Sequence, residues 1–295
     1  MDTNVVLKLP KYHRRTFVAL LIAIFVIIIL LDLRFGGVSL SGIFFAYTSS
    51  IAAAIITSLF VLWIAASFFP PPSETGLIEI APRKITHEFD KLLDVATRWR
   101  YKGNFGRYLR GRVLPALAGR QNVHVSACII DPANLNLCEK HAKYRSQINA
   151  IDKGRRYDSD QVAVEILATI VISAWYVKNR RVSVDIYLSP AFDPVRIDSN
   201  DQAMILTVED RRSPALKVTK KHFTYETFEL QMEYARNQAR KISLDGVREA
   251  VQLAEINEAD VAAVLYAAGL QPLCQRLTPT RILKACKESR NPYES

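Results

Sequence analysis

The chain has 295 residues, of which 49% are hydrophobic and 23% are charged. This length fits one large domain or two ordinary ones, at roughly 150 residues per domain, and the apolar content excludes disorder over most of the chain. The mean hydropathy of +0.05 averages an apolar stretch before Pro70 and a polar remainder, which excludes a purely soluble and a purely membrane-embedded protein. The 39 Lys+Arg against 29 Asp+Glu give a net charge of +10, which favours an anionic partner.

The four cysteines are widely spaced, which argues against a disulfide scaffold. Cys128, Cys138, Cys274 and Cys286 form no CxxC pair, so the usual zinc and redox signature is missing. We interpret them as reduced packing residues, which agrees with a cytosolic location.

The first predicted element is an apolar helix over residues 16–33. Thr16–Leu31 reads TFVALLIAIFVIIILL without a charged residue. About 20 apolar residues are needed to cross a hydrocarbon core of about 30 Å, so this stretch is just long enough. Arg14 and Arg15 would also suit a signal peptide, but no small-x-small cleavage site follows and a second apolar stretch begins almost at once.

The second apolar stretch, Val38–Phe69, contains no charged residue and ends at three prolines, Pro70–Pro72, which cannot continue a helix. We therefore expect a two-helix transmembrane hairpin over residues 16–69. A basic cytoplasmic tail (1–15) precedes it and a Pro-rich linker (70–77) follows it. Basic residues before the first helix and after the second place both termini in the cytoplasm of a multi-pass bacterial inner-membrane protein; these residues are Lys8, Lys11, Arg14, Arg15, Arg83 and Lys84.

Small residues spaced by four mark one face of the second apolar stretch, at Ser50, Ala54 and Ser58. Such a row lets two helices approach closely in lipid. It predicts either packing inside the hairpin or a contact between copies, which includes the lining of a pore. Because two helices per chain are too few for a monomeric transporter, we expect a homo-oligomer if the protein moves ions.

After the linker, the sequence predicts a cytosolic α/β domain over residues 78–242 and a helical C-terminal extension over 243–295. A strand at 122–131, a helix from Asp158 or Ser159 to Val177 and a strand at 181–188 form the pattern of a parallel crossover. The expected fold class is the transmembrane hairpin plus this α/β domain, with a short mixed or parallel sheet and flanking helices. The other predicted elements are helices at 85–102, 107–118 and 135–148, strands at 202–210 and 216–219, and helices at 225–242, 244–268 and 279–287.

The sequence offers no catalytic motif, metal site or cofactor site. It has no nucleophile elbow, Walker loop, H-E-x-x-H or dinucleotide fingerprint. Cys138 and His141 are three residues apart on a predicted helix, but no further zinc ligands are near. Asp131 ends a strand, and with Asp185 and Asp210 it could form a carboxylate cluster, although strand-end capping explains it as well.

A basic and aromatic span is the strongest local feature, because no acidic residue lies between Asp94 and Asp131. Arginine beside aromatic rings suits single-stranded nucleic acid or a nucleotide. It also suits lipid headgroups, or a solvated face whose rings are in the core. The predicted binding residues are Arg98, Trp99, Arg100, Tyr101, Lys102, Arg107, Arg110 and Arg112.

The layout of a short basic tail, two close apolar helices and a non-catalytic α/β domain resembles the two-transmembrane effectors of bacterial anti-phage retron systems. The resemblance implies a reverse transcriptase with its RNA–DNA product as partner. The runs LLDVATRWRYKGNFGRYLRGRVLPAL and CIIDPANLNLCEKHAKYRS also look like phospholipase-D-like defence domains. We interpret them as lacking the His-x-Lys motif of that family, so the likeness implies sensing or docking.

Two functions follow as hypotheses. In the first, the cytosolic domain senses a nucleic-acid-bearing partner or a nucleotide ligand, and the protein then oligomerises and depolarises the inner membrane as an anti-phage effector. A cyclic-nucleotide-gated effector is a variant of this hypothesis. In the second, the protein is a membrane-anchored enzyme acting on nucleotides or lipids, with Asp131 beside Arg98–Arg112. A membrane tether for another complex is the third alternative.

Overall fold

The structure is a computed structural model that describes residues 41–68, 76–148, 157–210 and 212–288, with seven further residues between 19 and 34. The chain divides into two compact units, Met1–Pro71 and Pro72–Ser295. In the first unit the main described element is helix α2, Ser41–Phe68. The predicted basic tail, most of the first predicted helix and the linker up to Thr75 lie outside the described residues.

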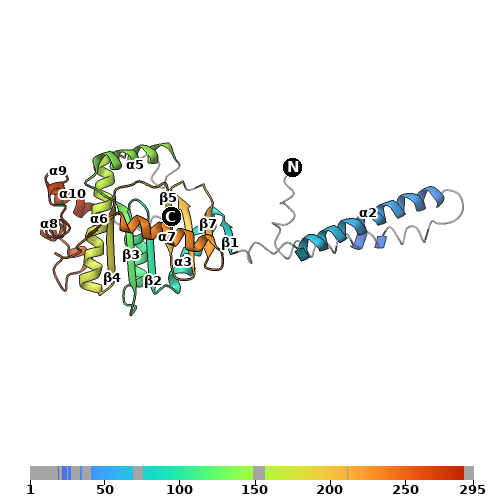
Figure 1. Ribbon diagram of the computed structural model, residues 1–295, viewed down its shortest axis with the longest axis horizontal. Coiled ribbons are helices and arrows are strands. Elements are labelled where there is room, and N and C mark those ends of the chain that lie inside the picture. The colour runs from blue at the N-terminus through green and yellow to red at the C-terminus, as the bar shows by residue number, and fades with distance from the viewer. Residues whose placement is uncertain are drawn as a thin grey trace. The chain divides into compact units, whose positions relative to one another are not determined.

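The second unit is built on one eight-stranded mixed sheet (Figure 1). Its strand order is β1-β7-β6-β5-β2-β3-β4-β8, in which β2, β3 and β4 are parallel and the other neighbours are antiparallel. The strands are β1 (Leu77–Ile80), β2 (Arg98–Lys102), β3 (His124–Ile130), β4 (Ser183–Ser189), β5 (Val195–Ser199), β6 (Ala203–Val208), β7 (Ala215–Thr219) and β8 (Arg240–Ile242).

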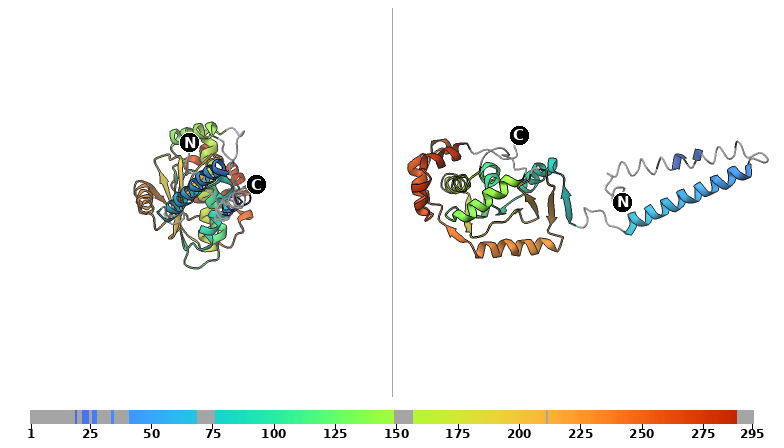
Figure 2. Two further views of the ribbon diagram at one scale, coloured as in Figure 1. Left: turned by 90° about the vertical axis from the view of Figure 1, so that its right-hand side faces the viewer. Right: turned by 90° about the horizontal axis from the view of Figure 1, so that it is seen from above.

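Helices cover the two faces of the sheet unequally (Figure 2). Helix α7 (Thr224–Asn237) lies along one face. The other face carries α3 (Ile85–Asp94), a π-helical turn (Leu109–Val113) continued by α4 (Leu114–Leu117), α5 (Leu135–Gln147) and α6 (Ser159–Arg180). Helices α8 (Glu258–Ala267), α9 (Pro272–Arg276) and α10 (Pro279–Lys287) follow β8, and short 3-10 turns occupy Pro82–Lys84 and Leu253–Glu255.

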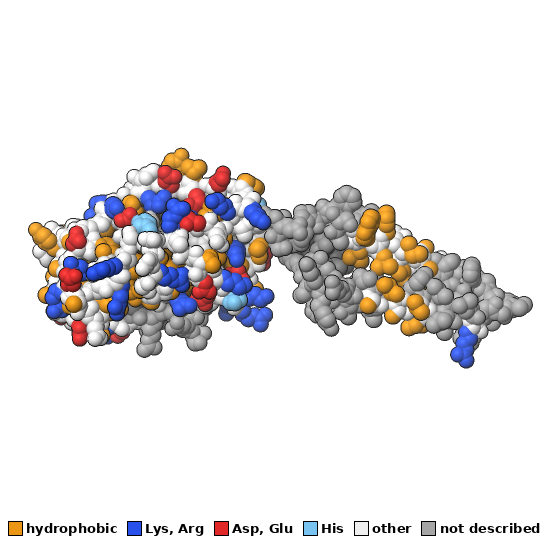
Figure 3. Space-filling view, turned by 90° about the horizontal axis from the view of Figure 1, so that it is seen from below, with side chains coloured by type: hydrophobic (Ala, Val, Ile, Leu, Met, Phe, Trp, Pro, Cys, Tyr) orange, Lys and Arg blue, Asp and Glu red, His pale blue; other side chains and the backbone are white. Residues whose placement is uncertain are grey.

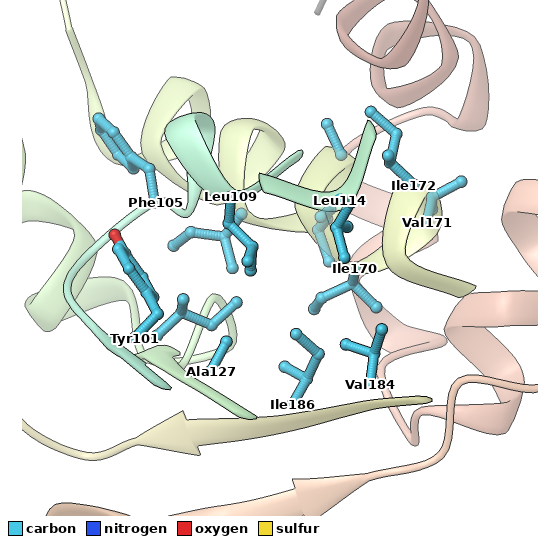
Figure 4. Close-up of a cluster of buried hydrophobic side chains, with 14 of the residues drawn as sticks. Tyr101, Phe105, Leu109, Leu114, Ala127, Ile170, Val171, Ile172, Val184 and Ile186 are labelled. Atoms are coloured by element: carbon cyan, nitrogen blue, oxygen red, sulfur yellow. The ribbon is translucent and has the colours of Figure 1, made fainter. Parts of the chain in front are cut away.

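Helix α6 is the centre of the main hydrophobic core. The Asp158 side chain accepts a hydrogen bond from the Gln161 amide and so caps its first turn. From Val162 to Tyr176 every residue of α6 is buried, since the sheet, α5 and α10 pack around it. Figure 4 shows Ile170 of α6 facing Val184 and Ile186 of β4. Residues of α8, α9 and α10 belong to this same core.

The predicted fold class was wrong in its membrane part. Among the described residues, the helix that is long and apolar enough to cross a membrane is α6, and 83% of its apolar window is buried inside the α/β unit. In α2, Ser50–Trp63 counts only as a shorter apolar helix. An uncharged apolar run in the sequence does not by itself fix the length of the helix that forms. The structure therefore does not contain the predicted two-helix transmembrane hairpin among its described residues, and multi-pass membrane topology has no support from it.

The predicted sheet also had too few strands. The expected strands at 122–131, 181–188, 202–210 and 216–219 are present, and β3 and β4 are parallel as the crossover predicted. The predicted helix 85–102 instead ends at Asp94, and Arg98–Lys102 forms the strand β2. The strands β1, β5 and β8 were missed, because each has five or fewer residues and contains charged side chains.

Candidate functional site

Strand β2 carries five of the predicted binding residues and separates them onto opposite faces of the sheet. Side chains of a strand alternate between faces. Trp99 and Tyr101 are buried on the face that packs against the main core, whereas Arg98, Arg100 and Lys102 lie on the α7 side. The basic and aromatic residues therefore do not form one continuous surface.

At the start of β2, two arginines pair with carboxylates of neighbouring elements. Arg98 and Arg100 both contact Asp201, at 3.0 and 3.1 Å. Arg100 also pairs with Glu229 of α7 at 3.0 Å and donates to the Tyr225 hydroxyl at 3.1 Å. Partial burial would raise the pKa of Asp201, but the two arginines outweigh it and lower that pKa. The contacts of Arg100 with Glu229 and Tyr225 join α7 to the sheet.

Two aromatic residues of the span, together with Phe89 of α3, surround a partly buried cation. The Arg196 guanidinium lies 4.9 Å from the ring centres of Phe89 and Tyr108 and 5.5 Å from that of Tyr101, and it pairs with Asp198. Trp99 donates to the same carboxylate at 3.3 Å. Such cation–π contacts strengthen when they are removed from water, so these rings stabilise the core.

At the carboxyl end of β2, the polar side chains form a partly buried network. Lys102 pairs with Asp193, and the amide nitrogen of Asn104 donates to the Asp193 carbonyl at 3.1 Å and to Glu209 at 3.0 Å. His141 Nε2 lies 3.0 Å from Glu209, and Arg145 pairs with the same carboxylate. Burial would raise the pKa of Glu209, but His141 and Arg145 outweigh it and lower the pKa to about 2.

A second ion cluster lies beside this network. Arg107 and Arg110 both pair with Glu165 of α6, and Arg110 also donates to Thr169 at 2.7 Å. Burial opposes ionisation of Glu165, yet the two guanidinium groups lower its pKa to about 2. Arg107 and Arg145 each lie about 5 Å from the centres of the Phe105 and Tyr157 rings.

The network at the carboxyl end of β2 is the candidate functional site, because α/β domains often place their sites at this edge of the sheet. His141 is 0% and Asn104 is 3% exposed. The His141 Nδ1 and the Asn104 Oδ1 have no hydrogen-bond partner in the structure.

Sequence reasoning missed the central residues of this network. The sequence pattern pairs His141 only with Cys138, and after β6 it indicates Asp210 instead of Glu209 as the candidate carboxylate. The signal was available in the strand-end position of Glu209, but its pairing with α5 needed the tertiary fold. No group of three or more potential metal ligands occurs in the described part of the chain.

The structure gives each predicted arginine of the span a protein partner. Arg112 completes the set through Asp90 at 2.9 Å. Because Trp99 and Tyr101 are buried, their rings are not available for stacking against a base in this fold. Ligand binding by the basic residues stays a prediction, and binding there would have to displace existing carboxylates.

The three predicted carboxylates are not brought together. Asp131 caps the loop after β3 by accepting a hydrogen bond from Ala133 at 2.9 Å, and Asp210 accepts one from Arg212. Asp185 pairs with Lys241 at 2.8 Å and lies 3.3 Å from His124. Arg98, at the start of β2, is at the other end of the strand from this edge, so Asp131 does not lie beside the whole basic span.

The prediction that the chain lacks a His-x-Lys motif was wrong, because His141-Ala142-Lys143 has that spacing. The two side chains do not act together, however. They lie on α5, where residues two apart point in different directions, and His141 is buried whereas Lys143 is exposed. Burial also raises the pKa of the Cys138 thiol to about 12, which makes it a poor nucleophile.

The predicted contact row of α2 lies on an exposed face. Ser50, Ala54 and Ser58 are exposed, whereas the partly buried side chains are Ala52, Ile55, Leu59 and Leu62. The Ser58 hydroxyl donates to the Ala54 carbonyl at 2.8 Å. The role of the row as a contact between helices stays a prediction.

Comparison with known proteins assigns no family. No family model matches the sequence, and no curated protein matches it. Among solved structures, the chain is similar to TrmBL2, an archaeal chromatin protein whose structure shows a novel mode of DNA binding. The identity is 12%, the TM-score is 0.35, and the match covers 67% of this chain and 66% of that one. A likeness at this level carries no functional argument.

Proposed function

We propose that this protein is a membrane-associated bacterial effector, in which α2 inserts into the inner membrane and the α/β unit receives the signal. The observation that carries the proposal is the exposed apolar surface of α2. The helix has 28 residues and no charged side chain. Five of its large apolar side chains are exposed; these are Ile51, Ile56, Phe60, Val61 and Trp63. Such a surface is unstable in water.

The hydroxyl groups of α2 suit a lipid environment. Thr57 and Ser58 each donate to the carbonyl four residues earlier, at 2.8 Å. A polar group in hydrocarbon needs a partner inside the protein, and these bonds supply it.

The charge and the thiols favour a cytoplasmic location for the α/β unit. Arg83 and Lys84 come soon after α2 and are exposed, and basic residues near a membrane helix favour the cytoplasmic side. All four cysteines are free, which agrees with a reducing compartment. Figure 3 shows basic and acidic side chains interspersed on the α/β unit and apolar side chains on the unit that contains α2.

The effector role extends this anchoring. In the resting state of such an effector, a nucleic-acid-bearing partner holds the α/β unit inactive. The expected partner is a reverse transcriptase with its RNA–DNA product. Release lets copies associate through the exposed Ser50, Ala54 and Ser58 face and depolarise the membrane. The test is membrane potential and growth in cells that express the protein alone or with its genomic neighbours. Depolarisation in one of these conditions is expected, and its absence in all of them would refute the effector role.

Anchoring is tested by flotation of the full chain with phospholipid vesicles. The wild-type chain should float with the vesicles. The double variant Ile56→Lys/Phe60→Lys should not, because each charge near the middle of the bilayer costs about 2.5–3.5 kcal/mol.

The matched control is Val95→Lys/Leu135→Lys, which replaces two exposed apolar residues of the α/β unit. This control should float as the wild type does. A wild-type chain that stays with the unbound fraction, or an α2 variant that floats unchanged, would contradict the proposal.

A further inference from the structure

The turn between β7 and α7 displays an aromatic side chain that the fold does not use. Phe223 is 78% exposed, the largest value among the exposed large hydrophobic residues of the described chain. Lys220 and Lys221 precede it and are also exposed. The turn therefore presents an apolar ring and two cationic side chains on one exposed surface.

The turn holds these side chains in a fixed arrangement. The Lys220 amide donates to the Gln202 carbonyl at 2.9 Å, and the His222 amide donates to the Thr219 carbonyl at 3.0 Å. His222 Nδ1 lies 2.7 Å from the Thr224 hydroxyl, and its ring centre is 4.7 Å from that of Phe223. A preorganised turn loses little conformational entropy when a surface covers it.

Helix α7 is anchored directly behind the turn. Tyr225 is buried and donates to the Asn200 carbonyl at 2.6 Å. Tyr225 and Met232 face the sheet, whereas Phe223, Leu230 and Tyr234 are exposed on the opposite side, at positions that share one helical face. Exposed glutamates at 226 and 233 flank this stripe, so the cationic part of the surface is confined to Lys220–Phe223.

The chain enters the α/β unit at this same turn. Thr219 donates to the Gly76 carbonyl at 2.7 Å, and a Cβ built on Gly76 would lie 3.1 Å from His222 Cβ. Seven residues, 69–75, separate α2 from Gly76. An extended chain covers at most about 3.6 Å per residue, so a membrane reached by α2 stays within about 30 Å of the turn, however the two units are arranged.

We propose that Lys220, Lys221 and Phe223 form a docking surface for the anionic phospholipid headgroups of the leaflet in which α2 is anchored. The inference rests on the proposed anchoring by α2. Lysines supply attraction to anionic lipids, and an aromatic ring beside them inserts at the headgroup level. The short tether keeps the local concentration of lipid surface high, so a weak contact is enough. Docking would orient the α/β unit on the membrane.

The test is quenching of a tryptophan introduced at position 223 by brominated lipids. The variant Trp63→Phe/Phe223→Trp of the full chain is placed in vesicles with or without phosphatidylglycerol, at low and at high NaCl concentration. The other tryptophans, Trp99 and Trp175, are buried. Quenching is expected in anionic vesicles at low salt. The equilibrium constant for docking, obtained from the quenching, should fall about fivefold for each lysine removed, the factor that corresponds to about 1 kcal/mol per basic residue. The quenching should also fall in high salt.

Charge reversal provides the matched control. Adding Lys220→Glu/Lys221→Glu should abolish the quenching, whereas Lys140→Glu/Lys143→Glu on the exposed surface of α5 should not. Three results would overturn the proposal: no quenching of the introduced tryptophan in any vesicle, quenching independent of anionic lipid, or shielding of that tryptophan that depends on protein concentration, which indicates a second copy.

Quenching of Trp63 in the unsubstituted chain tests the anchoring by α2 independently of the docking surface. Quenching of Trp63 without quenching of the introduced tryptophan rejects the docking surface and keeps the anchor. Absence of quenching at both positions rejects both the docking surface and the anchor.

Discussion

The two units of the chain place their apolar side chains in opposite ways. In α2, Phe60 and Trp63 are 57% and 62% exposed, whereas Trp99 and Trp175 of the α/β unit are 0% and 3% exposed. Helices α2 and α6 are both long and apolar, but α6 is enclosed by the sheet and by neighbouring helices. The comparison teaches that apolar composition alone does not separate a core helix from a membrane helix. What surrounds the helix decides between them.

The largest expected effect concerns the buried charges of the α/β unit. Glu165→Gln should destabilise this unit by about 3–5 kcal/mol, because it leaves Arg110 and Arg107 without their carboxylate. Denaturant unfolding of the full chain, followed by the emission of Trp99 and Trp175, measures the change. Unfolding at the wild-type midpoint would show that this ion cluster does not stabilise the core. Flotation with vesicles should be unaffected in native conditions.

Acid should destabilise the same unit for the same reason. Glu165 and Glu209 have pKa values of about 2 in the folded chain, against 4.5 for the ordinary group. Their contribution is present above pH 4.5 and is lost as the pH falls from there towards 2. With about 1.36 kcal/mol per pKa unit, each contributes on the order of 3 kcal/mol.

Unfolding free energies of Glu209→Gln between about pH 7 and about pH 3, a range that spans the titration of these carboxylates, test this dependence. The variant should show a shallower acid decline than the wild type, since one of the two titrating groups is gone. An equally steep decline would assign the acid sensitivity to other groups.

Much of the α/β unit was predictable from the sequence because its long elements repeat one pattern. The β-branched run at β3, the capped apolar run of α6 and the alternation at β4 each identify their element. The strand β2 was missed because arginines alternate with aromatic residues there, a pattern that also fits a helix face next to α3. The side chains of β2 pair with Asp201, Asp198 and Asp193, which are about 90 to 100 residues away in the chain. These aspartates reach β2 only through the pairing of β5 with β2.

A smaller effect is expected at the start of α8. Asn257 accepts hydrogen bonds from the Ala259 and Asp260 amides, at 3.0 and 3.1 Å, and Asp260 reciprocates at the Asn257 amide. Asn257→Ala should cost about 1 kcal/mol. Because α8 belongs to the main core, the loss should appear in the unfolding of the whole α/β unit. A separate early transition of residues 243–295 would instead make these helices an independent extension.

The smallest effect on stability, and the sharpest contrast between the units, is expected for Ser58→Leu. The side chain is exposed on α2, so unfolding of the α/β unit should change by less than about 0.5 kcal/mol. Crosslinking between copies in vesicles should decrease, because a leucine prevents close approach of two small-residue faces. Thr57→Leu is the matched control on a neighbouring position. Equal crosslinking by the two variants would remove the Ser50, Ala54 and Ser58 row as a contact.

The most direct measurement of the central claim is the quenching of Trp63 by brominated phospholipids in the unaltered chain. Trp63 is exposed on α2, whereas Trp99 and Trp175 are buried in the α/β unit, so lipid should quench only one of the three tryptophans. The account predicts that vesicles of brominated lipid reduce the emission of the wild-type chain and leave that of Trp63→Phe unchanged. Equal emission of the wild-type chain in brominated and ordinary vesicles would contradict membrane insertion of α2.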